Sequence, residues 1–238
     1  MPKELSEKPG KIEMHNIHKP SALLPKEIIQ VMEKEKMTQL RPCQQKALDA
    51  GLLNFQNLLI CTPTASGKTF IAEIAFVNAI SKGIGKAIYI VPLKALAAEK
   101  YKEFKERYGH KLRIALSIGD IDSSEDYLVD YDLIICTAEK LDSLIRHHCP
   151  WLPYVKVVIV DEIHLINDPS RGPTLEILIT IIKQILKNVQ LIGLSATIGN
   201  PEQLADWLDA KLVIDTWRPV VLKKGVYLDG EITFQDEE

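Results

Sequence analysis

Residues 62–69, TPTASGKT, are of the types that hold a nucleoside triphosphate. They fit the phosphate-binding P-loop pattern G-x-x-x-x-G-K-[ST], with Thr62 in the place of the first glycine and with Gly67, Lys68 and Thr69 intact. A triphosphate needs backbone N–H groups, the positive end of a helix, a point charge and a hydroxyl group for Mg²⁺. Lys68 would supply the charge and Thr69 the hydroxyl group. For so short a pattern taken alone, an ordinary loop is the alternative.

Two adjacent carboxylates, Asp161 and Glu162, follow an apolar run further along the chain. Asp161 would hold the hydration shell of the Mg²⁺ bound to Thr69. Glu162 would orient and deprotonate the water that attacks the γ-phosphate. A solvated acidic turn is the alternative, and the P-loop upstream favours the catalytic interpretation.

Three further polar residues could connect the nucleotide to the rest of the domain. His164 lies two residues beyond Glu162, and Ser195 and Thr197 offer hydroxyl groups after another apolar run. A hydrogen-bonded bridge between them would transmit the state of the nucleotide, as a motor requires. Taken alone, the Ser-Ala-Thr segment is equally typical of a helix cap or turn.

Alternating apolar runs and amphipathic segments must position these groups. Such alternation predicts an α/β fold with a mostly parallel sheet covered by helices on both faces, in one domain of about 200 residues. Strands are expected at residues 58–61, 87–91, 114–118, 133–136, 157–160 and 191–194. Helices are expected at residues 25–36, about 44–50, 70–80, about 96–108, 139–146, 174–187 and 200–208.

Short polar segments follow five of these apolar runs: TPTASGKT, PLKAL, TAEK, DEIH and SAT. In open α/β sheets, ligand-binding groups gather beyond the carboxyl ends of the strands. The five segments are therefore expected to line one edge of one sheet.

Composition limits the class of protein. With 238 residues and 46% hydrophobic residues, the chain can form a packed core. Its net charge of −3 means that any nucleic-acid contact must rely on a local basic surface. The absence of a long apolar run and of a signal-like start predicts no membrane contact and an intracellular, cytoplasmic or nucleoid-associated location. The four cysteines lack C-x-x-C spacing and are expected to be buried free thiols.

Eight motifs occur in a characteristic order and spacing: LRPCQQ, TPTASGKT, VPLKALAAEKY, TAEKLDSLIRH, DEIH, RGPTLE, LSAT and WRPVVLKKGV. As a set they resemble the first RecA-like domain of a superfamily 2 DExH helicase, over roughly residue 20 to the end. Within that superfamily the chain resembles the superkiller-like branch, and in particular the archaeal Hjm (Holliday junction migration) DNA helicases. The resemblance implies ATP and Mg²⁺ as cofactors, single-stranded or branched DNA as the partner, and a role in DNA repair and recombination.

The same resemblance implies roles for individual residues. Gln44 would read the adenine edge, although the family often has an aromatic residue where Arg41 stands and proline where Cys43 stands. The catalytic residues would be Glu162, Asp161 and Lys68, and His164, Ser195 and Thr197 would couple hydrolysis to movement. The phosphates and the metal would be held by Thr64, Ala65, Ser66, Gly67, Lys68 and Thr69. Nucleic acid would contact Pro92, Lys94, Ala95, Gly119, Asp120 and Thr137.

The domain organisation expected from the resemblance has three parts: a flexible arm over residues 1–20, the ATP-binding domain over 21–215, and a linker over 216–238 toward a second RecA-like domain that the 238 residues lack. That second domain would supply arginine fingers, which are worth roughly 10³ to 10⁵ in turnover. Weak nucleotide binding, very slow hydrolysis and no unwinding are therefore expected of this chain. The alternatives are a lobe of an RNA-processing DExH helicase and a stand-alone nucleotide-binding regulatory module.

Overall fold

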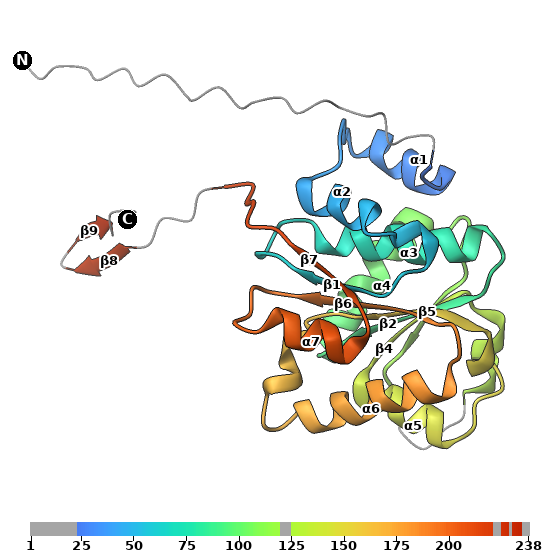
Figure 1. Cartoon of the computed structure of the whole chain (residues 1–238). Helices are drawn as coiled ribbons and strands as arrows, with labels where there is room; N and C mark the ends of the chain where they lie inside the picture. The colour runs from blue at the N-terminus through green and yellow to red at the C-terminus, as the bar shows by residue number, and fades with distance from the viewer. Residues whose placement is uncertain (1–22, 120–124, 221–224, 229, 235–238) are drawn as a thin grey trace, which may run out of the picture.

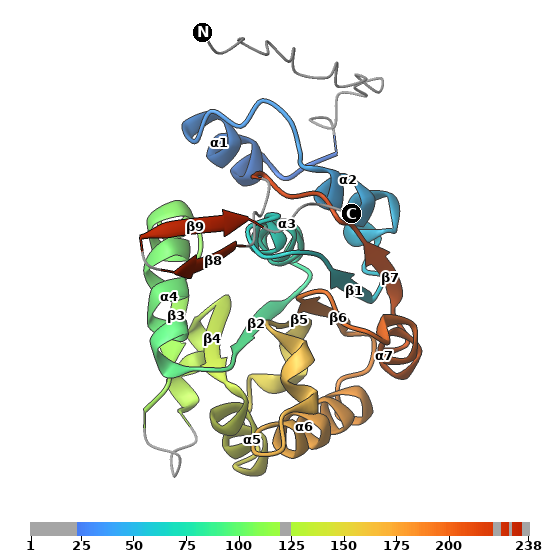
Figure 2. The ribbon, with the colours of Figure 1, turned by 90° about the vertical axis from the view of Figure 1, so that its left-hand side faces the viewer.

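The computed structural model describes residues 23–119, 125–220, 225–228 and 230–234. Within these residues, seven strands form one sheet through the centre of the molecule (Figure 1). Every neighbouring pair in this sheet is parallel, and the order is β3-β4-β2-β5-β6-β1-β7 (Figure 2). The strands are β1 Leu58–Cys61, β2 Lys86–Val91, β3 Ile114–Ser117, β4 Leu133–Thr137, β5 Val155–Val160, β6 Gln190–Ser195 and β7 Lys211–Ile214.

Helices cover both faces of the sheet, with α1 to α4 on one side and α5 to α7 on the other (Figure 1). The α-helices are α1 Lys26–Lys34, α2 Pro42–Asp49, α3 Lys68–Ser81, α4 Lys94–Tyr108, α5 Ala138–Arg146, α6 Gly172–Ile185 and α7 Pro201–Leu208. Short 3₁₀ helices lie at η2 Leu52–Asn54, η3 Asp126–Asp130, η4 Leu152–Tyr154 and η5 Ile163–Asn167.

The strand sequences are nearly continuous apolar runs because both faces of the sheet are buried. In β1, Leu58 and Ile60 join the core beneath α1 to α4, whereas Leu59 and Cys61 join the core above α5 to α7. Helix α3 is apolar around most of its circumference because it lies between the sheet and helices α1 and α2. The predicted strand, loop and buried helix at residues 58–80 are therefore confirmed.

The expected α/β fold with a parallel sheet is confirmed, and the six expected strands correspond to β1 to β6. Strand β7 was not expected. It is an edge strand beside β1, and two of its four residues are exposed, so its pattern lacks the apolar run of a central strand. At the start of α7, the side chains of Asn200 and Gln203 bond to each other, and neither caps the helix backbone.

The expected linker contains a further element. Strands β8 Gly225–Leu228 and β9 Glu231–Phe234 pair antiparallel with each other, and their residues are exposed. The arm expected over residues 1–20, and Asp120, lie outside the described residues. No helix within the described part of the chain is long and apolar enough to cross a membrane.

Candidate functional site

The strands that carry the polar segments end in register. Cys61 of β1 is aligned with Ser195 of β6, and Val91 of β2 is aligned with Thr137 of β4. Val160 of β5 is aligned with Ile90 of β2. The loops that follow these five strands therefore leave the sheet at one edge, as the sequence predicted.

The P-loop folds closely over the start of α3. The Lys68 ammonium donates hydrogen bonds to the carbonyl oxygens of Thr62 and Pro63, at 2.8 and 3.2 Å. The hydroxyl groups of Thr62 and Ser66 lie 2.7 Å apart. Burial lowers the pKa of Lys68, and the nearby charges of Glu162 and Asp161 oppose that shift. Lys68 therefore interacts electrostatically with both carboxylates.

Helix α2 holds the P-loop through Gln44. Its side-chain oxygen accepts from the Arg41 backbone N–H at 2.8 Å, and its NH₂ group donates to the carbonyl oxygen of Gly67 at 3.2 Å. Gly67 has φ +97°, and a Cβ there would come 2.6 Å from the Gln44 nitrogen. Only glycine fits this position, because it tolerates both the left-handed backbone and the close approach.

The two positions that depart from the family pattern also contact the P-loop. An Arg41 Nη1 donates to the carbonyl oxygen of Ala65 at 2.6 Å, and the Cys43 thiol lies 3.3 Å from the carbonyl oxygen of Ser66. The Arg41 guanidinium lies 5.6 Å from the ring centre of Trp217, within cation–π range. Arg41 and Cys43 therefore help to fix the P-loop against the start of α2.

Asp161 is fixed by hydrogen bonds on both oxygens. The Tyr89 hydroxyl donates to Oδ2 at 2.7 Å, and the Glu162 backbone N–H donates to Oδ1 at 3.0 Å. Burial and the Asp161 charge hold the pKa of Tyr89 well above its ordinary value, so its hydroxyl stays a donor. The sequence analysis missed Tyr89, although a tyrosine inside the apolar run AIYIV needs a polar partner.

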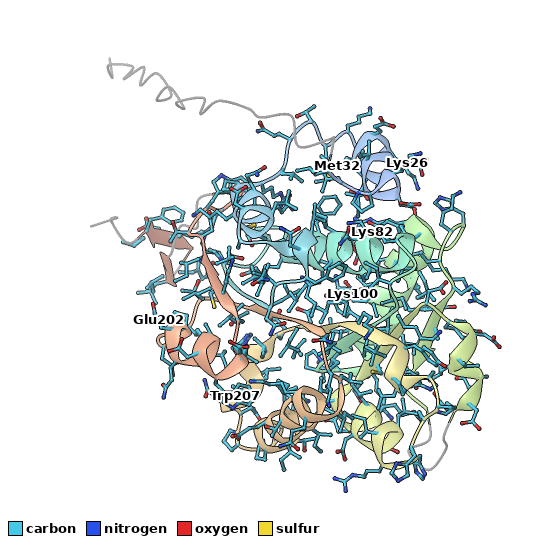
Figure 3. The ribbon with its side chains drawn as sticks, turned by 45° about the vertical axis from the view of Figure 1, so that its right-hand side comes forward. Lys26, Met32, Lys82, Lys100, Glu202 and Trp207 are labelled. Atoms are coloured by element: carbon cyan, nitrogen blue, oxygen red, sulfur yellow. The ribbon has the colours of Figure 1, made fainter. Side chains whose placement is uncertain are left out.

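The Thr69 hydroxyl lies next to a lysine of α4. Lys100, labelled in Figure 3, approaches the Thr69 oxygen at 3.4 Å and pairs with Glu103 at 2.9 Å. Thr69, Asp161 and Glu162 offer a hydroxyl group and carboxylates, which are the oxygen ligands that Mg²⁺ prefers. The donor set therefore fits the magnesium ion expected from the sequence.

The coupling residues are close in the fold but are not bonded to one another. His164 Nδ1 lies 3.3 Å from a Glu162 carboxylate oxygen, but the angle does not make a hydrogen bond. Ser195 is buried and donates to the carbonyl oxygen of Ala196, while Thr197 is exposed. Among the described residues, no hydrogen bond joins His164 to either hydroxyl group, so the bridge stays a prediction.

A cavity of about 270 Å³ collects most of the residues expected to contact nucleic acid. Lys94 is exposed at the start of α4, and Gly119 follows β3. Thr137 caps α5 by accepting from the Lys140 backbone N–H at 3.3 Å. Ala95 is exposed next to Lys94 but does not line the cavity. The lining consists of Pro92, Leu93, Lys94, Ile118, Gly119, Thr137, Glu139 and Lys140.

Comparison with solved structures gives the same architecture. The chain superposes on the crystal structure of the DUF1998 helicase MrfA bound to DNA with a TM-score of 0.72 and 25% sequence identity, covering 82% of this chain and 30% of that one. A crystal structure of MrfA bound to DNA and AMPPNP matches equally, over 82% of this chain and 29% of that one. The fold is thus a RecA-like helicase domain.

Curated relatives are considerably more similar in sequence. The chain is 54% identical over 209 residues to the ATP-dependent DNA helicase Hel308 of Pyrococcus horikoshii, covering 88% of this chain and 29% of the relative. It is 58% identical over 220 residues to Hel308 of Methanocaldococcus jannaschii, covering 89% of this chain and 18% of the relative. The chain therefore spans less than a third of the length of these relatives.

A protein-family model gives the assignment. The model described as DEAD/DEAH box helicase matches residues 41–204. That range includes the P-loop, both carboxylates and the loops that follow β1 to β6. The chain belongs to the DEAD/DEAH box helicase family.

Proposed function

We propose that this chain is the ATP-binding lobe of an ATP-dependent DNA helicase or translocase that acts on forked or branched DNA in repair and recombination. The alignment of the P-loop, the Asp161–Glu162 pair and the cavity beside Lys94 along one sheet edge carries this proposal. DNA is favoured over RNA because the similar relatives are named DNA helicases.

In this proposal, Lys68 and the P-loop backbone bind the outer phosphates. Gln44, whose amide group bonds to Arg41 and Gly67, would exchange its bond to Gly67 for one to the adenine edge. Bound Mg²⁺ would neutralise phosphate charge and orient the γ-phosphate. Thr69 and Asp161 would hold the ion, and the Tyr89 hydroxyl keeps Asp161 oriented. Glu162 accepts the proton of the attacking water, because its partly exposed carboxylate directly follows Asp161 and acts electrostatically on Lys68.

The nucleic-acid backbone would lie against the cavity formed by the loops after β2, β3 and β4. Lys94 supplies a positive charge to a phosphate, and the Thr137 hydroxyl group and the Gly119 backbone supply polar contacts. Such backbone contacts fix the position of the strand without reading its sequence.

Nucleotide binding tests this proposal most directly. We expect a fluorescent ADP to bind the 238-residue chain in the presence of Mg²⁺, and Lys68→Ala to weaken that binding by about 10- to 100-fold, since a charged hydrogen bond is worth about 1.5 to 3 kcal/mol. Lys82→Ala is the matched control, because Lys82 is exposed at the far end of the same helix (Figure 3). Glu162→Gln should leave the affinity within about twofold, because it acts on water and not on the ground-state nucleotide.

Equal losses for Lys68→Ala and Lys82→Ala would contradict the P-loop assignment. Loss of nucleotide affinity in Glu162→Gln would mean that this residue supports the fold of the site. Tighter binding of single-stranded RNA than of DNA of the same sequence would favour an RNA-processing lobe.

A further inference from the structure

Arg171 connects two of the loops at the carboxyl edge, and the motif that contains it, RGPTLE, has no role in the site described so far. It is the partly buried residue that precedes α6. Its Nη1 donates to the carbonyl oxygen of Pro92 at 3.3 Å. Pro92 directly follows β2 and leads into Lys94. A single side chain therefore joins the segment after Glu162 to the loop expected to contact nucleic acid.

Hydrogen bonds to Asp168 fix the backbone at Arg171, in the segment that follows Asp161 and Glu162. The Asp168 carboxylate accepts from the backbone N–H groups of Ser170 and Arg171, both at 2.9 Å, and also from the Ser170 hydroxyl. These bonds, chiefly the one from the Ser170 hydroxyl, hold the pKa of Asp168 below its ordinary value. The turn therefore stays formed wherever Asp168 is ionised.

Gly172 fixes this turn against η5, the 3₁₀ helix that begins directly after Glu162. Its N–H donates to the carbonyl oxygen of Asp168 at 2.8 Å. A Cβ at Gly172 would lie only 2.1 Å from the carbonyl oxygen of Ile166. The start of α6, which Arg171 precedes, is therefore packed directly against η5.

The space between the two loops is small. Arg171 lines a cleft of about 20 Å³ together with Pro92, Glu139, Asp161 and Glu162. A second connection runs beside it, since the Asp161 backbone N–H donates to the carbonyl oxygen of Ile90 at 2.8 Å. A displacement of Pro92 would therefore shift Arg171 and the loop that carries Asp161 and Glu162 together.

We propose that Arg171 is a positioning residue that couples nucleic-acid binding at residues 92–94 to the placement of Asp161 and Glu162. This inference rests on the proposed function, because it assumes that both ligands bind at this edge. Coupling of this kind is reciprocal. A bound nucleotide must therefore change the affinity for DNA by the same factor by which bound DNA changes the affinity for the nucleotide.

The test measures that factor with the 238-residue chain. Fluorescence anisotropy gives the dissociation constant of a labelled single-stranded oligonucleotide with and without a saturating non-hydrolysable ATP analogue and Mg²⁺. We expect at least a fivefold ratio for the wild type, which is the lower end of typical coupling. Arg171→Ala should reduce the ratio below about twofold, with each ligand alone binding as in the wild type.

Two further variants separate positioning from general damage. Arg171→Lys should restore part of the ratio, because a lysine can still donate to the Pro92 carbonyl oxygen. Arg146→Ala is the matched control, since Arg146 is an exposed arginine paired with Asp142 on α5, and it should keep the wild-type ratio.

Each result distinguishes the inference from the proposed function. A wild-type ratio in Arg171→Ala, or a ratio near one in the wild type while both ligands bind, would overturn the inference and leave the proposed function intact. No binding of either ligand by the wild type would overturn the proposed function itself. If Arg171→Ala fails to fold, Arg171→Lys decides, and loss of both single-ligand affinities in that variant would reduce Arg171 to a structural role.

Discussion

Lys94 differs from the other lysines of the site in having its charge free for a ligand. It is exposed at the first turn of α4, and within the described residues no hydrogen bond or ion pair involves it. Lys68, by contrast, is buried and donates to two carbonyl oxygens, and Lys100 pairs with Glu103. Lys94 is therefore the residue of this edge best placed to bind a phosphate from solvent.

Lys94→Ala should weaken single-strand binding by a few fold and make it less dependent on salt. Each phosphate contact to a single strand contributes about 0.7 to the slope of log K against log salt, so the slope should fall by about that amount. Lys102→Ala serves as the control, because Lys102 is an exposed lysine further along the same helix. An anisotropy titration at several salt concentrations measures both slopes. Identical slopes for wild type and Lys94→Ala would favour a nucleotide-binding module without a nucleic-acid partner.

Sequence patterns predicted the residues whose type is set by the expected ligand. They did not predict the residues that hold those side chains in place. Lys68, Thr69 and Asp161 could be found because phosphate and Mg²⁺ chemistry demands those groups at that spacing. The partners of Tyr89 and Arg171 could not be predicted, because these partners lie more than 70 positions away in the chain. Spacing in the chain carries no information about such pairs until the strand order is known.

At the level of elements, helices α3 and α4 are joined by a buried charged network. Glu73 of α3 is fully buried and accepts from Arg107 and from the Tyr108 hydroxyl, both at 2.6 Å. Arg107 also contacts Glu35 and Glu103, so it lies among three carboxylates and neutralises Glu73 only in part. Burial consequently raises the pKa of Glu73 to about 7, against the opposing effects of Arg107 and Tyr108.

This pKa predicts how stability depends on pH. The folded protein holds the Glu73 proton up to about pH 7, whereas the unfolded chain releases it near 4.5. Between these values the folded state binds more protons, so the contribution of Glu73 to stability decreases as pH rises, by up to about 1.4 kcal/mol per pH unit. Glu73→Gln removes that contribution, because an amide does not titrate. Its unfolding free energy should decrease less than that of the wild type between pH 5 and 7.

Urea unfolding at three pH values measures the difference. Glu99→Gln is the control, since Glu99 is exposed on α4 and should leave the wild-type slope unchanged. Parallel pH profiles for wild type and Glu73→Gln would show that Glu73 is ionised in the folded protein throughout this range.

At the same level, the sequence predicted the helices and strands whose burial requires an apolar pattern. Strands β1 to β6, including the edge strand β3, and helix α3 are almost entirely buried, so their apolar runs predicted them. Strand β7 pairs only with β1 at the edge of the sheet, and β8 and β9 are exposed, so their backbone hydrogen bonds and not their burial define them. Apolar patterning alone does not detect such strands.

At the level of the whole molecule, five of the six arginines already have partners within the domain. In the described part of the chain, Arg107, Arg113 and Arg146 pair with carboxylates, while Arg41 and Arg171 donate to backbone carbonyl oxygens. Arg218 is exposed beyond Trp217. We therefore expect any arginine directed at the γ-phosphate, which raises turnover by roughly 10³ to 10⁵ in other NTPases, to come from outside this domain.

We accordingly expect the 238-residue chain to hydrolyse ATP very slowly, even when single-stranded DNA is bound. The rate per chain should also be independent of chain concentration, because hydrolysis within one domain needs no partner. A coupled assay at chain concentrations spanning about two orders of magnitude tests this, with Glu162→Gln as the blank for contaminating ATPases. A rate per chain that rises with concentration would mean that a second copy supplies the missing arginine, and a fast, DNA-stimulated rate at low concentration would mean that one of the arginines named above reaches the phosphate.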